Sequence, residues 1–340
     1  MEKKGQLGST FKYIFILIVG ALFLVFFVRF AMQYASTAEA VDISQWLTNL
    51  EDRLSALGSV SDATSYPIFA TTSELMILEG TLTSGRISHQ TNKIIYAPFE
   101  MRTNEPLIWT RRWNYPYEIT SFFYFSSRDR KYYVVYRDEI QEIKNYVEDL
   151  IGTVHYPSIP LEFNFDVISI NELNTNLENI RNMGGNFQEN VFIFIGNPDW
   201  FRELENRVKN VPNSRTVVVE PEGIDKDLEH GYVYIEDQKT MYIGREMLYG
   251  AFFANNFDNY EYNLDLALER LFTVTEIYDR KTGYLRSKKP ECGYDLFRTL
   301  LDTYKTRANE KNKNPATYAD LVDSLTRQNR AFRGGCPSVF

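Results

Sequence analysis

The sequence predicts an α/β protein that is attached to a membrane by its first helix. Three observations support this fold class. An uncharged run fills positions 13–28, strand and helix patterns alternate between positions 161 and 220, and the patterns from position 264 onward are helical. We therefore expect a transmembrane helix that continues into an amphipathic helix, then a mixed, partly parallel sheet with flanking helices, and a helical C-terminal part.

The composition fits a folded protein and excludes several classes. The chain has 340 residues, of which 44% are hydrophobic and 24% are charged. Its net charge of −8 argues against nucleic acid as a partner, because binding phosphates requires a basic surface. Two cysteines and three histidines are too few for a disulfide-rich scaffold, and we find no cofactor motif. We expect neither a metal ion nor a cofactor.

The first expected element is a membrane span over residues 13–32. Sixteen residues without charge are followed by Arg29 and three more apolar residues. A helix of about 20 residues crosses a bilayer core, and the long side chain of Arg29 can reach the interface. The Ala38-Glu39-Ala40 sequence has the form of a signal-peptidase site but lies well beyond the apolar run, which favours a retained anchor over a cleaved signal.

Flanking charge predicts the orientation of this span. Lys3, Lys4 and Lys12 precede it, whereas Arg29 alone follows it closely. Because positive residues stay on the cytoplasmic side, residues 1–12 are expected in the cytoplasm and the rest of the chain outside the cell. The sequence therefore predicts a single-pass protein of the cell membrane, with the lipid bilayer as its first partner.

The residues before the span form a short motif. Lys4, Gly5 and Gln6, followed by a hydrophobic helix, resemble the N-terminus of archaeal class III prepilin-like proteins. In that family a prepilin peptidase cuts between the Gly and the Gln of a lysine-rich leader. The resemblance implies cleavage after Gly5, a pilin-like subunit and a place in an archaeal envelope. Plain cytoplasmic lysines before an anchor are the alternative.

An amphipathic helix is expected over residues 33–58. Apolar residues recur at spacings of three and four, and Gly58 offers a C-terminal cap. The stripe consists of Ala40, Ile43, Leu47, Leu50, Leu54 and Leu57. It packs either on the chain's own globular part, as in pilin-like subunits, or on other envelope or pilus subunits. We favour the first, because the stripe is too short for an autonomous coiled coil.

Residues 66–283 are expected to form an α/β domain. Its first part is mainly strands, with a hairpin between residues 117–125 and 131–136, and a helix over 138–151 follows. The clearest fold signal comes next, as strands over 161–169, 190–195 and 215–220 alternate with helices. Short loops between these elements predict a parallel sheet. Residues 232–243 then suggest an antiparallel hairpin.

Residues 284–340 are expected to be a helical C-terminal extension. Helices are predicted over 294–308 and 315–332, after a helix over 264–280 that ends the α/β domain. Outside the cell a disulfide can persist, so we expect Cys292 to pair with Cys336. Two unpaired thiols are the alternative.

Candidate ligand-binding residues lie where the parallel strands end. Ligands of open α/β sheets bind at the carboxyl ends of the strands, where polar side chains are expected to form an acidic crevice. These residues are Asn171, Asn197, Asp199, Glu220 and Glu222. The alternative for Asn197 and Asp199 is structural, as a helix cap and a first-turn acid.

A second candidate is a segment rich in aromatic residues and arginine. Arginine among Trp and Tyr is typical of binding hot spots, which predicts a partner surface. Its residues are Trp109, Arg111, Arg112, Trp113, Tyr115 and Tyr117. Ordinary cation–π packing within the domain is the alternative.

The sequence leaves two hypotheses for function. No P-loop, dinucleotide-binding, zinc-protease or serine-hydrolase motif is present. The first hypothesis is therefore a non-enzymatic assembly or binding component of the envelope, pilus-like in its anchor. The alternative is a membrane-anchored hydrolase that uses the acidic crevice.

Overall fold

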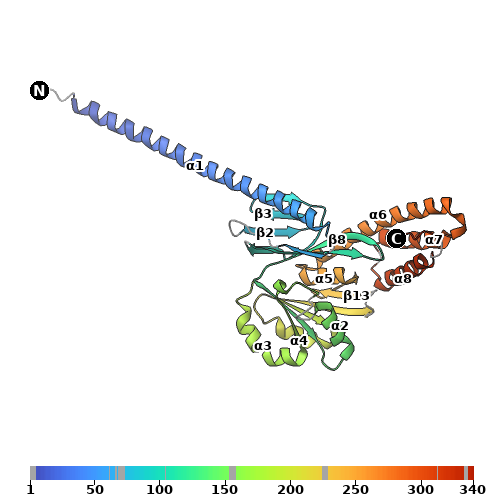
Figure 1. Ribbon diagram of the computed structural model, residues 1–340. Helices are drawn as coiled ribbons and strands as arrows, with labels where there is room; N and C mark the ends of the chain where they lie inside the picture. Colours follow the sequence, from blue (N-terminus) through green and yellow to red (C-terminus); the bar gives the residue numbers. More distant parts are fainter. Residues whose placement is uncertain are drawn as a thin grey trace.

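The computed structural model describes residues 5–60, 62–65, 67, 73–103, 105–152, 158–223, 229–311, 313–332 and 336–340. A single long helix, α1, projects like a rod from a globular head (Figure 1). The described residues of the head form three sheets, with helices α2 to α8 around them (Figure 1). This α/β architecture, with an apolar N-terminal helix, mixed sheets and a helical C-terminal part, is the fold class expected from the sequence.

Helix α1 (Gly5–Leu57) joins the expected span to the expected amphipathic segment without a break. Its section Lys12–Tyr34 is long and apolar enough to cross a membrane, and none of that stretch is buried against the head. Further along the helix, Leu47, Leu50 and Leu54 are at most 1% exposed. The stripe therefore packs on the chain's own head, as expected.

The C-terminal end of α1 packs against two four-stranded sheets. The small sheet has the order β4 (Ile87–Gln90), β3 (Thr81–Ser84), β2 (Ser73–Leu78), β6 (Glu100–Thr103). The central sheet has the order β1 (Asp62–Ser65), β7 (Leu107–Asn114), β8 (Glu118–Ser126), β5 (Ile94–Tyr96). The α1 stripe, the small sheet and one face of the central sheet share one hydrophobic core.

The large sheet has six strands. Its order is β10 (Phe165–Ser169), β9 (Arg130–Tyr136), β11 (Glu189–Ile195), β12 (Ser214–Gly223), β13 (His230–Ile235), β14 (Gln238–Ile243). Strands β10, β11 and β12 are parallel and β13 and β14 form an antiparallel pair, as expected. Strand β9 was not expected in this sheet, but it lies between β10 and β11 and is parallel to both. Strand β10 starts at Phe165 rather than at residue 161, because Leu161–Phe163 form a short 3-10 turn.

The helices cover both faces of the large sheet. Helices α3 (Ile170–Gly184) and α4 (Arg202–Val208) pack on one face. The other face and the inner face of the central sheet share the main core with α2 (Gln141–Ile151), α5 (Arg245–Phe253), α6 (Phe257–Lys288), α7 (Asp295–Asn309) and α8 (Pro315–Ala331). Helix α6 continues through Gly283, where the sequence had predicted its end. Residues of α7 and α8 belong to the same main core as the sheets.

The expected hairpin between β8 and β9 does not form. Strand β8 pairs with β7 and β5 in the central sheet, whereas β9 pairs with β10 and β11 in the large sheet. Both strands are apolar on both faces, because each separates two cores: Phe122 and Phe123 of β8, like Tyr132 and Tyr133 of β9, enter different clusters. Two such strands fit best in the middle of different layers.

The chain end is tied to the helical part by the expected disulfide. The sulfur atoms of Cys292 and Cys336 are 2.05 Å apart. Beside them, the Tyr294 hydroxyl donates a hydrogen bond to the carbonyl of Pro337, and Asn329 Oδ1 accepts one from the amide of Val339. The last residues are thus part of the fold.

Candidate functional site

The polar residues at the ends of the parallel strands have separate local partners. Asn171 donates to Asp138 at 3.3 Å, and Asn197 Oδ1 caps the turn after β11 by accepting from the amide of Asp199. Asn197 therefore acts as the N-terminal cap of the turn that starts at Pro198. This is the structural role that the sequence left open as the alternative to ligand binding.

The acidic members of this set are also occupied. Asp199 pairs with Arg202 on the surface, and Glu220 accepts hydrogen bonds from Tyr234 at 2.7 Å and Lys239 at 3.2 Å. Glu222 is exposed. No hydrogen bond or ion pair joins Asn171, Glu220 and Glu222 to one another, and within the described ranges no cluster of His, Cys, Asp or Glu could hold a metal ion.

The aromatic residues of the second candidate lie inside the head. Trp109, Trp113, Tyr115 and Tyr117 are each less than 5% exposed and belong to the main core. They cannot meet a partner unless the head opens. The cation–π alternative describes Arg111, whose guanidinium lies 5.6 Å from the centre of the Trp109 ring.

The two arginines of this segment point to opposite faces of β7. Arg112 donates to the carbonyl of Ser59 and pairs with Glu118 at 3.0 Å. Arg111 faces the main core and lines a pocket of about 380 Å³. We call this the charged pocket; its charged residues are Arg111, Asp149, Glu229, Arg245 and Glu246.

Arg245 is the paired cation of the charged pocket. It lies at the start of α5, where its Nη2 contacts Asp149 of α2 at 2.6 Å. Its Nε donates to Oε1 of Glu229, which directly precedes β13. The guanidinium therefore connects three elements of the head through charge-assisted hydrogen bonds.

Two carboxyl groups of this pocket have raised pKa values. Burial raises the pKa of Glu229 from 4.5 to about 7, although the neighbouring Arg245 opposes the shift. Burial also raises the pKa of Glu246, against the opposing effect of Arg111. The side chain of Glu229 is only 2% exposed, and its Oε2 atom has no hydrogen-bond partner among the described residues. A strongly shifted acid in a pocket is typical of functional sites.

Of the residues that line this pocket, Arg111 and Tyr115 were candidates from the sequence. Asp149, Glu229 and the neighbouring pair Arg245 and Glu246 come from three distant segments, and no motif links them. Only the packing of α2, α5, β7 and β13 brings them together.

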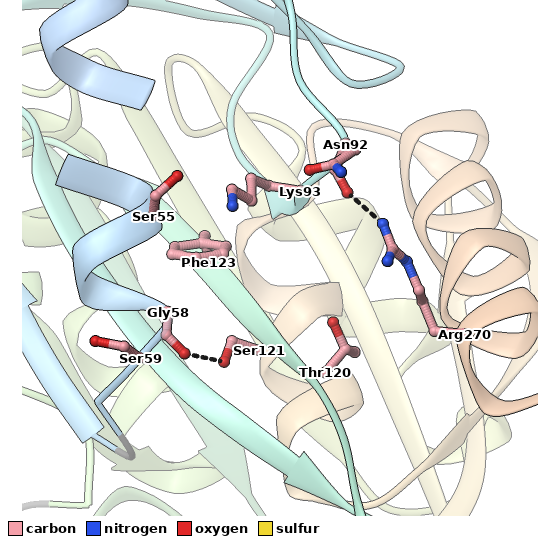
Figure 2. A pocket seen from close by; sticks show the side chains of 9 residues that line it. All are labelled: Ser55, Gly58, Ser59, Asn92, Lys93, Thr120, Ser121, Phe123 and Arg270. Carbon is pink, nitrogen blue, oxygen red and sulfur yellow. Dashed lines mark hydrogen bonds between the residues drawn. The ribbon is translucent and has the colours of Figure 1, made fainter. Parts of the chain in front are cut away.

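A second pocket lies where α1 meets the head (Figure 2). It also measures about 380 Å³, and its lining includes Lys93, Arg270 and several hydroxyl groups but no carboxylate. Arg270 donates to the carbonyl of Asn92, and Ser121 donates to the carbonyl of Gly58 at the end of α1 (Figure 2). Lys93 forms no ion pair with any described residue, so this basic pocket can accept an anionic group.

Comparisons add no relative to this picture. No family model matches the chain, and neither curated proteins nor solved structures contain a significant match.

Proposed function

We propose that this chain is a single-pass membrane protein of the cell envelope, whose head lies outside the cytoplasm and serves assembly or binding rather than catalysis. The observation that carries the proposal is the division of α1 into two parts. The apolar residues of the first part are exposed, with Tyr13 at 74% and Phe30 at 59%, whereas Leu47, Leu50 and Leu54 of the stripe are buried on the head. An apolar surface all around a helix of this length fits lipid or other apolar helices, not water.

The same division supports a pilin-like role within the envelope. A pilin-like subunit combines a protruding apolar helix with a head that packs on the second half of that helix. Here the docked stripe fixes the head to the helix, because Leu47, Leu50 and Leu54 enter the core between the two four-stranded sheets. The protruding part is then left for a bilayer or for the helices of neighbouring subunits.

Two further features agree with an outside location for the head. Lys3, Lys4 and Lys12 precede the apolar segment, which favours a cytoplasmic N-terminus. The Cys292–Cys336 disulfide is of the kind that persists in oxidising surroundings. The hydrolase alternative draws no support from the strand-end residues, because their side chains have separate partners.

N-terminal sequencing of the mature protein from membranes tests the pilin-like part of the proposal. A chain that begins at Gln6 supports processing after Gly5. An intact Met1 contradicts it and leaves a plain anchor. A Gly5→Leu variant, which alters the residue before the cut, should accumulate with its leader attached if a prepilin peptidase acts here. If the wild-type chain also keeps residues 1–5, removal of the leader by a prepilin peptidase is contradicted.

A further inference from the structure

The charged pocket has hydrogen-bonding capacity that the fold itself does not use. The Oε2 atom of Glu229 is buried without a partner, and no hydrogen bond from Arg111 to a described residue is present. The nearest carboxylate oxygen to Arg111, on Glu246, lies 3.7 Å away, which is beyond hydrogen-bond distance. Buried polar groups are nearly always satisfied in proteins, which makes the Glu229 oxygen an exception. The Arg111 side chain is 24% exposed and lines the same pocket, where its N–H groups can donate to a bound molecule.

The unused groups have opposite requirements. The Arg111 guanidinium offers only donors and a positive charge, and it is held in place over the rings of Trp109 and Tyr249. The free Glu229 oxygen is the strongest acceptor when the carboxylate is ionised, and in that form it is best satisfied by a cationic N–H donor. Arg245 does not fill that role, because it already contacts Asp149 and the other oxygen of Glu229.

The charge of the pocket narrows the ligand class. Two arginines face three carboxyl groups, and burial raises the pKa of both Glu229 and Glu246. The Arg245 guanidinium is engaged by Asp149 and Glu229, whereas Arg111 has one long ion pair, 3.7 Å from Glu246, and makes no hydrogen bond to a described residue. A simple anion would satisfy only Arg111, and a simple amine would satisfy only Glu229.

We propose that the charged pocket binds a small zwitterion of the α-amino acid type, with its carboxylate on Arg111 and its ammonium group on Glu229 and Glu246. The volume of about 380 Å³ is at the lower end of the range for ligand pockets, which suits a metabolite of this size. The proposal concerns the head alone and is independent of the membrane orientation.

Isothermal titration calorimetry on the full-length protein in detergent tests this site. The probes are the standard amino acids, each at neutral pH. At least one should bind, whereas acetate and ethylammonium, which carry one charge each, should bind at least about 100-fold more weakly because each leaves one protein group unpaired. Glycine betaine should not bind, since it has both charges but no N–H donor for Glu229.

Variants locate the binding site. Arg111→Gln and Glu229→Gln should each weaken binding by about 10-fold or more, the usual effect of losing one charged hydrogen-bond partner. Arg112→Gln is the matched control, because it alters the neighbouring arginine on the opposite face of β7 and should bind like the wild type. Near-UV circular dichroism reports whether each variant folds. The two pocket variants alter different elements, so if one of them fails to fold, the other still tests the site.

Three results would overturn the proposal. One is the failure of every amino acid to bind at millimolar concentration. Another is competition by acetate or ethylammonium as strong as that of the amino acid, which would indicate a simple ion site. The third is unchanged affinity in a folded Arg111→Gln or Glu229→Gln variant, which would place the ligand elsewhere.

Discussion

Replacing Glu229 by Gln should make the head more stable relative to the wild type as pH rises. Burial raises the pKa of Glu229 from 4.5 to about 7, so the folded chain holds this proton more tightly than the unfolded chain does. Stability linked to this group is therefore lost as pH rises from 4.5 through 7. A pKa that is higher by about 2.5 in the folded chain corresponds to about 2.5 kcal/mol of unfolding free energy between pH 5 and pH 8, because part of the effect lies outside this range.

The assay is thermal unfolding of full-length protein in detergent, followed by tryptophan fluorescence, because Trp109 and Trp113 are buried in the main core. For a head of about 300 residues, about 2.5 kcal/mol corresponds to roughly 4 °C in Tm. The Tm of Glu229→Gln minus that of the wild type should rise by this amount between pH 5 and pH 8. Asn182→Gln, which alters an exposed residue of α3 and no titratable group, is the control and should give the same difference at both pH values.

The groups that face Glu229 define what this comparison isolates. They are Asp149 and Tyr146 from α2, Arg245, Glu246 and Tyr249 from α5, and Tyr242 from β14. All of them are present in both proteins, so their own titration largely cancels in the difference. A Tm difference that is constant with pH, or that falls as pH rises, would refute the reasoning. The second result would mean that Glu229 is ionised and stabilised by Arg245.

Three further changes test the packing of the head. Leu50→Ala should lower stability by about 2–5 kcal/mol in the same unfolding assay, while Val41→Ala, at an exposed position of the same helix, should change it little. Gly250→Ala should lower the free energy of unfolding by about 1–3 kcal/mol, because the new Cβ would lie 2.5 Å from the Tyr96 ring. Gly283→Ala places its Cβ in no such contact and should stabilise α6 by up to about 1 kcal/mol. Cys336→Ser should cost about 4 kcal/mol, since it opens a loop closed across 44 residues; equal Tm values for the variant and the non-reduced wild type would contradict this.

Much of the fold could be predicted because local signals and tertiary packing agree. The uncharged run and the stripe predicted α1. The Ser169 side chain caps α3 by accepting from the amide of Glu172, a bond that the local Ser-x-x-Glu sequence favours. The β8–β9 pairing failed for a physical reason. A short polar turn between two apolar strands is typical of a hairpin, but it does not reveal that each strand is buried on both faces in a different sheet.

The candidate sites were less accessible to prediction. The sequence identifies the aromatic–arginine segment but does not show whether it lies on the surface or in the core. Strand alternation places Trp109, Arg111 and Trp113 on one face of β7, and only the packing of the head makes that face the inner one. The acids of the charged pocket gave no signal, since ion pairs between distant segments follow no spacing rule. Burial, which sets the pKa of Glu229, is a property of the packed head.

The abundance of tyrosine also has a structural explanation. Buried tyrosines connect separate elements by donating hydrogen bonds from their hydroxyl groups to backbone carbonyls. Tyr124 donates to Glu246, Tyr249 to Leu150, Tyr260 to Met241 and Tyr304 to Tyr115. Each ring fills the core while its hydroxyl satisfies a buried carbonyl, so tyrosine suits a core that joins two sheets and several helices.

The central claim is that α1 crosses a membrane and holds the head outside, and thiol labelling on intact cells tests it most directly. Both native cysteines are joined in the disulfide, so an introduced cysteine is the only free thiol. Asn182→Cys, at an exposed position of α3, should react with a membrane-impermeant maleimide on intact cells, whereas Ser9→Cys should react only after the cells are permeabilised. Labelling of Ser9→Cys but not Asn182→Cys on intact cells would contradict the account.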